Sequence, residues 1–411
     1  MYSPLTRTTK LPDLLLPIFS GIALLLLFVG PFCWPAMNNS SESSLRVALL
    51  LGFFTAVLSH RKPVMDLNLL IFLSFWIYLF LNAFFFGNAQ MMRRLAVILI
   101  FVYVSAIALK DFCFCRKWIS IVTAAIAFCA LFSIVSHMVF GELTLSYRLA
   151  AISGSGFENF AEFHNSVDAG TYYAPALAFA IWLALTEKKR IAIVGWALCA
   201  FIIAVFLYFT YARTAWLACM AFVVILFMFA ATPRVRNSVF WIMGIAILLA
   251  MIFVSDVILY ELTERGLTFR DEIWSNVISR LPGHWMFGYG AGADTGPFSI
   301  GNENQIVWHV HNLYLQILYQ FGLSGLILML IASTACLVKL FRLRSNALAS
   351  LWLAILSGGL LSMFFAMNNF VGSPNRIWIY FWLPVAGCLA LAENGIIPTR
   401  SSPAVCSICR K

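Results

Sequence analysis

Side chains able to accept a proton and to bind an anion gather in the longest polar stretch of the chain, residues 263–322. The stretch contains Arg270 near its beginning, and His309 and His311 near its end. A neutral imidazole can accept a proton at physiological pH, because its ordinary pKa is about 6.5. A guanidinium binds phosphate or carboxylate through two parallel hydrogen bonds. The stretch therefore predicts a site that holds an anion and accepts a proton.

Arg270 falls on a segment, residues 268–281, whose apolar residues recur at the spacing of an amphipathic helix. Thr268 fits the N-cap position, and Asp271 and Glu272 suit the first turn. Helical geometry places Arg270 in the middle of the apolar stripe, where an unpaired charge is costly. We expect its guanidinium to meet an anion or a wet cavity. The alternative is an arginine that extends its charge to the membrane boundary.

His311 is expected to begin the next apolar helix, on the same side as Leu315, Leu318 and Gly322. The positive end of the helix dipole would favour its neutral ring. His309 competes for the same role, and a structural role is the alternative for either histidine.

The helices that must position these groups are apolar. The chain has 411 residues, of which 62% are hydrophobic and 11% charged, and this excludes an ordinary soluble domain. Apolar runs long enough to cross a bilayer recur along it. We predict an all-α polytopic membrane protein of about twelve transmembrane helices, near residues 14–32, 45–59, 67–86, 94–109, 118–140, 171–186, 191–209, 212–231, 238–259, 312–338, 347–367 and 376–392.

The basic residues predict how the chain is oriented. Most of the 27 lysines and arginines fall on one side of these spans, together with both termini, and the positive-inside rule makes that side cytoplasmic. The net charge of +10 then reflects topology and contact with membrane lipids, and no nucleic-acid partner is expected. The basic residues on the opposite side are all arginine, which suggests a phosphate-bearing ligand there: Arg46, Arg93, Arg94, Arg148, Arg213, Arg265, Arg270, Arg280 and Arg376.

Other outer segments contain further candidates. In residues 141–170, Arg148 is a candidate anion contact. Glu158, Glu162 and Asp168 could balance the arginines, bind sugar hydroxyls or simply be solvated. A tight turn at 209–216 puts Arg213 at the depth of the lipid headgroups, beside Tyr211; Trp216 could instead make it an interfacial anchor. The glycines at 288, 290 and 292 predict a flexible turn that could let backbone approach a ligand. A polar cluster that could help hold a headgroup is formed by Asn82, Gly87, Arg93 and Arg94.

Metal and cofactor sites are not expected. The ten cysteines form no disulfide framework, and Cys113 with Cys115, like Cys406 with Cys409, lacks further ligands nearby. Paired carboxylates of the Asp-x-Asp or Glu-x-Asp type do not occur.

Three motifs in order carry a resemblance to a known family. They are Arg213-Thr214 at the start of a span, Arg270 to Trp274 running on to Phe287-Gly288-Tyr289-Gly290, and His311-Asn312-x-x-Leu315 followed by Gly322. Together they resemble the bacterial O-antigen ligase and polymerase superfamily of C-type glycosyltransferases. One departure is Gln320, where the family often has an acidic residue.

The resemblance implies a metal-independent, inverting enzyme without cofactors, in the inner membrane, with its active site on the periplasmic face under a lid. An O-antigen ligase transfers the glycan of undecaprenyl pyrophosphate-linked O-antigen to a sugar hydroxyl of the lipid A–core oligosaccharide. His311 would be the general base, and Arg213 and Arg270 would complete the catalytic set by holding the pyrophosphate. The candidates for substrate binding are Arg148, Arg265, Asn312, Tyr211 and Trp274.

Two other readings stay open. One is an O-antigen polymerase or a protein O-oligosaccharyltransferase of the same superfamily. The other is a transporter or flippase of a polyprenyl-linked glycan, which would require charges at mid-membrane depth. The charges here collect at one face, which favours chemistry at an interface.

The chain is accordingly expected to divide into six parts. Residues 1–140 hold spans 1–5, 141–170 form a periplasmic segment, 171–259 hold spans 6–9, 260–311 form a large periplasmic loop with the amphipathic helix, 312–392 hold spans 10–12, and 393–411 form a cytoplasmic tail.

Overall fold

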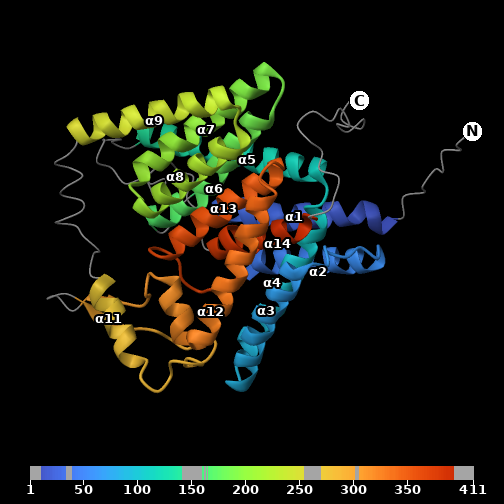
Figure 1. The fold of residues 1–411 in the computed structure, drawn as a ribbon, viewed down its shortest axis with the longest axis vertical. Helices are drawn as coiled ribbons and strands as arrows, with labels where there is room; N and C mark the ends of the chain where they lie inside the picture. Colours follow the sequence, from blue (N-terminus) through green and yellow to red (C-terminus); the bar gives the residue numbers. More distant parts are fainter. Residues whose placement is uncertain are drawn as a thin grey trace, which may run out of the picture.

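The protein is an all-α polytopic membrane protein (Figure 1). The structure, a computed structural model, describes residues 11–33, 39–140, 160–161, 163, 165–253, 270–300 and 305–392. Its helices are α1 (Leu11–Cys33), α2 (Asn39–Leu58), α3 (Leu67–Phe85), α4 (Ala89–Ala108), α5 (Phe112–Phe140), α6 (Ser166–Thr186), α7 (Arg190–Thr210), α8 (Arg213–Ala230), α9 (Pro233–Phe253), α11 (Arg270–Arg280), α12 (Leu313–Arg342), α13 (Ala347–Met363), the π-helix η1 (Trp378–Trp382) and α14 (Leu383–Ala390).

Helices occupy all twelve positions predicted as spans. Among the described residues, eight helices are long and apolar enough to cross a bilayer, and the apolar helices 347–363 and 378–390 are shorter. The fold class is confirmed, while the number of crossings and the orientation in the membrane stay predictions.

Helix α6 lies in the interior of the bundle, in contact with α5, α7, α8 and α13 (Figure 1). Gly170 permits this packing at one end, because a Cβ there would lie 2.7 Å from the Cβ of Ala212 and 3.0 Å from that of Ala215. The beginning of α6 is thereby fixed against the turn that leads into α8.

Helix α12 is broken at Gly322, whose φ of 67° and ψ of −173° leave the helical region. The N–H groups just after the break donate to carbonyl groups of a neighbouring loop. Leu323 N–H donates to the carbonyl of Trp285 (2.7 Å), and Ser324 N–H to that of Met286 (3.2 Å). Irregular backbone is tolerated between membrane helices when its polar groups are satisfied in this way. The sequence predicted an unbroken helix here, with glycines that allow a close neighbour. The close neighbour is present, but it is a loop that enters the break.

That loop, residues 285–292, is called the glycine loop below. The sequence predicted a flexible outer turn that could let backbone approach a ligand. The loop's backbone binds α12 and α3, so its close neighbours lie within the protein, and an approach to a ligand stays a prediction. Tyr289 N–H donates to the carbonyl of Tyr319 (2.8 Å), and Gly290 N–H to that of Gln320 (2.9 Å). Asn82 of α3 donates to the carbonyl of Phe287 (3.1 Å) and accepts from Ala291 N–H (2.9 Å), so its side chain holds this loop. A headgroup at its polar cluster stays a prediction.

The predicted amphipathic helix is present as α11, which lies beside the first part of α12 (Figure 1). Its apolar stripe buries Ile273 and Val277, together with Leu281 just beyond its end. A short antiparallel hairpin, β1 (Phe298–Ile300) and β2 (Gln305–Val307), packs against it and was not predicted. We refer to α11, the glycine loop and this hairpin together as the lid.

The break in α12 should depend on glycine. A Cβ on residue 322 would lie 2.3 Å from the backbone of Met286, and φ is positive, so Gly322→Ala should destabilise the protein by at least about 2 kcal/mol. The apparent midpoint of thermal unfolding in detergent measures this. Gly195→Ala is the matched control, since a Cβ there meets nothing within 4 Å. Equal midpoints for the two variants would show that the loop does not need the break.

Candidate active site

Five helical segments begin around one site, and each contributes a charged or titratable side chain near its N-terminus. Arg213 is the first residue of α8, Arg270 the first of α11, and His311 lies two residues before α12. Asp168 is in the first turn of α6, and Arg376 lies two residues before η1. Arg213 acts electrostatically on Arg270, while Arg270, Arg376 and Asp168 act on His311. Charges from segments as far apart in the sequence as Asp168 and Arg376 thus act on one imidazole.

Arg270 is partly buried, and this burial together with the neighbouring charge of Arg213 lowers its pKa. An arginine keeps its charge at neutral pH in spite of such a shift, because its ordinary pKa exceeds 12. Two guanidinium groups close enough to repel each other form a favourable place for an anion.

His311 is neutral at physiological pH in the structure. Burial lowers its pKa to about 4, assisted by the charge of Arg270, by His309 and by Arg376, and opposed by Asp168. The sequence predicted a neutral ring at the start of α12, with a pKa near the ordinary value. The ring is neutral, but His311 precedes the N-cap Asn312, and burial and Arg270 are the cause.

The backbone on both sides of His311 is fixed. Trp274 donates from its indole nitrogen to the carbonyl of Val310 (3.1 Å), and Val310 itself is buried. On the other side, the Asn312 side chain accepts from Leu315 N–H (3.1 Å) and is 3% exposed. These two predicted substrate contacts therefore position His311, and a direct contact of either with substrate stays a prediction.

His309 lies next to His311, with the two ring centroids 6.4 Å apart. His309 is exposed and His311 is partly buried among the charges of the site. The burial and the neighbouring arginines single out His311 of the two.

Arg376 and Asp168 lie near His311 but were not among the predicted catalytic or substrate-binding residues. Nη1 of Arg376 forms an ion pair with Asp168 and donates to the hydroxyl of Thr171 (3.1 Å). The sequence signal for Arg376 was its place among the outward arginines, and the signal for Asp168 was the acidic composition of residues 141–170. Neither signal indicates that the two residues meet.

The remaining candidates divide into two groups. Tyr211 ends α7 with a left-handed φ of 48°, and its ring packs 5.9 Å from that of Trp216, so it shapes the turn that presents Arg213. Arg148 and Arg265 lie outside the described residues. Within the described ranges, no three His, Cys, Asp or Glu side chains form a group that could hold a metal ion.

Comparison with known proteins bears on the segment that contains most of these residues. Residues 198–330 match the family model described as O-antigen ligase. A curated O-antigen ligase of Pseudomonas aeruginosa is 28% identical over 134 residues. The predicted resemblance to the O-antigen ligase superfamily is confirmed. The match spans about a third of the chain and of that O-antigen ligase, 32% of each. Arg213, Arg270 and His311 lie inside the segment that matches the O-antigen ligase family, whereas Asp168 and Arg376 lie outside it.

The lowered pKa of His311 predicts how stability depends on pH. Between about pH 6.5 and pH 4 the unfolded chain binds a proton at this position and the folded protein does not, so stability falls as pH falls through this window. His311→Gln should reduce this loss, as measured by the thermal midpoint from pH 7 to pH 4. His60→Gln, at an exposed turn, should keep the wild-type dependence. The same slope for His311→Gln and wild type would contradict the burial of a neutral ring.

Proposed function

We propose that the protein is an O-antigen ligase: a glycosyltransferase of the bacterial inner membrane that acts on the periplasmic face. It transfers the glycan from undecaprenyl pyrophosphate-linked O-antigen to a sugar hydroxyl of the lipid A–core oligosaccharide. The observation that carries the proposal is that Arg270 lies within electrostatic reach of both Arg213 and His311, and that all three fall in the segment that matches the O-antigen ligase family.

The arginines suit the leaving group of this reaction. When the bond between the anomeric carbon and the pyrophosphate breaks, negative charge develops on the phosphate oxygens. Guanidinium groups already in place around that position stabilise the charge without rearrangement, as a metal ion does in other enzymes. The charge of Arg213 acts unfavourably on that of Arg270, so a diphosphate between the two guanidinium groups would offset their repulsion.

His311 suits the acceptor. A neutral imidazole can take the proton of the attacking hydroxyl, and direct displacement with one base predicts inversion at the anomeric carbon. A pKa of about 4 makes the imidazole of His311 a weak base. A bound diphosphate would offset the charges of Arg270 and Arg376, which lower that pKa, and would raise it toward the ordinary value. The donor would thus activate the base.

A lipid-linked donor also fits the surroundings. An open cavity of about 480 Å³ lies between α12 and α13 and is lined almost entirely by apolar and aromatic side chains: Tyr314, Leu337, Ser357, Leu360, Leu361, Phe364 and Phe365. The ring of Phe364 packs 5.9 Å from that of Trp274, which binds the backbone beside His311. An apolar tail placed there would have its headgroup near Arg270, one helical turn before Trp274.

The base assignment is tested with purified protein and both lipid substrates. His311→Ala should lower the rate of transfer about 10²–10⁴-fold, the usual contribution of a general base, while the protein still folds. His309→Ala, at the exposed neighbour, is the matched control and should keep most of the activity. Wild-type rates in His311→Ala would remove the base assignment.

The same assay separates ligation from polymerisation. A ligase joins the glycan to lipid A–core, whereas a polymerase lengthens the glycan on its polyprenyl carrier. We expect the joined product from the wild-type protein. Lengthened donor without joined product would replace the ligase proposal by the polymerase one.

A further inference from the structure

The site contains an ion pair between Arg376 and Asp168. The proposed reaction assigns no role to this pair. The two side chains are 15% and 26% exposed, so a ligand in the site can reach them. Both contacts of Arg376, with Asp168 and with Thr171, involve Nη1. A guanidinium also carries donors on Nε and Nη2, and these are the atoms with which it would grip a phosphate.

An unusual helix start follows Arg376 directly along the chain. The last apolar segment begins with the π-helix η1. Such π-helical turns are rare in proteins, and those that occur are often found at functional sites. Tyr380, within η1, donates its hydroxyl to the carbonyl of Thr171 (2.9 Å). The π-helical turn and Arg376 are thus attached to the same residue of α6.

The loop that precedes Arg376 is also tied to the helix that follows His311. Asn369 N–H donates to the side-chain oxygen of Gln316, on the first turn of α12 (2.8 Å), and Asn369 has a left-handed φ of 59°. The Asn375 side chain accepts from Ile377 N–H (2.8 Å). These contacts fix Arg376 between α6 and α12, on the side of the imidazole.

Arg376 and Asp168 also affect the imidazole in opposite directions. Arg376 lowers the pKa of His311 and Asp168 raises it. Both groups therefore lie within electrostatic reach of the atoms assigned to proton transfer, as Arg270 does. An ion pair that served only to attach the last loop to α6 would not need to lie within electrostatic reach of His311.

We infer that Arg376 is a third phosphate-binding guanidinium of the site, and that Asp168 positions it and competes for it with the diphosphate. This inference rests on the proposed function, because the ligand it assigns is the diphosphate of that donor. Asp168 neutralises Arg376 through their ion pair. When a diphosphate binds, its oxygens compete with the carboxylate of Asp168 for hydrogen bonds from the Arg376 guanidinium.

The test measures the affinity of the full chain for inorganic pyrophosphate by calorimetry, in nanodiscs of uncharged lipid. Arg376→Gln should weaken binding at least about tenfold, the usual effect of losing a charge-assisted hydrogen bond. Asp168→Asn should tighten binding up to about fivefold, because it removes the competing carboxylate. An ion pair with a purely structural role would lower the thermal midpoint in both variants and move neither affinity.

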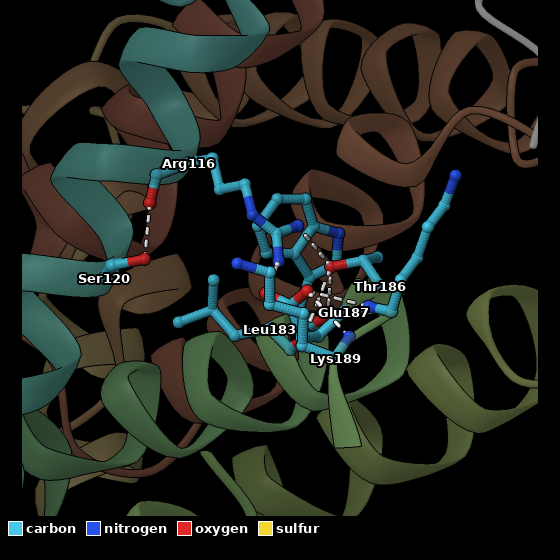
Figure 2. A network of polar contacts seen from close by, with 8 residues as sticks. Arg116, Ser120, Leu183, Thr186, Glu187 and Lys189 are labelled. Carbon is cyan, nitrogen blue, oxygen red and sulfur yellow. Dashed lines mark hydrogen bonds and ion pairs between the residues drawn. The ribbon is translucent and has the colours of Figure 1, made fainter. Parts of the chain in front are cut away.

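The chain offers a matched control at the other end of α6. Arg116 donates to the Thr186 hydroxyl (3.1 Å) and pairs with Glu187 (2.7 Å), which reproduces the threonine and carboxylate partners of Arg376 (Figure 2). Arg116→Gln and Glu187→Gln should leave pyrophosphate affinity unchanged.

The outcomes separate this inference from the proposed function. If Arg270→Lys weakens pyrophosphate binding while Arg376→Gln and Asp168→Asn bind as the wild type does, the inference is overturned and the proposed function stands. If none of these variants changes binding, both are overturned. If Arg376→Gln fails to fold, the pyrophosphate affinity of Asp168→Asn tests the inference alone. Tighter binding than wild type supports the inference, and unchanged or weaker binding overturns it.

Discussion

Electrostatic repulsion between fixed cationic groups is the constraint on which the rest of the structure depends. Arg213 and Arg270 lie close enough for one to lower the pKa of the other, and burial, assisted by the charge of Arg270, lowers the pKa of His311 and keeps it neutral. These groups sit at or beside helix N-termini, whose dipoles add further positive potential. Positive charges placed this close favour a multivalent anion between them, and the fold must hold the groups together against their mutual repulsion.

Two close backbone approaches hold them. Gly170 lets the start of α6 touch the turn before Arg213, and Gly322 breaks α12 so that the glycine loop can enter it. The lid is then attached to the membrane helices through backbone hydrogen bonds and through Asn82 of α3, and Trp274 of α11 fixes the backbone beside His311. A lid held in this way orders its catalytic groups in advance, and less binding energy of the substrate is then needed to arrange them.

The sequence was informative where the physical signal is local. Long apolar runs predicted the helices, the 3.6-residue period predicted α11, and the short motifs around Arg213, Arg270 and His311 predicted the family resemblance. It failed where the answer depended on distant partners. The glycines at 288, 290 and 292 signal unusual backbone conformations, but whether the close neighbour is a ligand or α12 is a tertiary fact. The ion pair between Asp168 and Arg376 joins residues more than 200 positions apart, and charge patterning does not pair such residues.

The most direct measurement of the central claim is the titration of His311 by NMR on protein with labelled histidine, with and without inorganic pyrophosphate. The His311 signal is identified by its loss in His311→Gln. Without pyrophosphate the ring should stay neutral to about pH 4. With pyrophosphate bound, its titration should move toward the ordinary value, because the anion offsets the surrounding arginines. The same midpoint with and without saturating pyrophosphate would show that the anion does not bind among these groups, and would contradict the account.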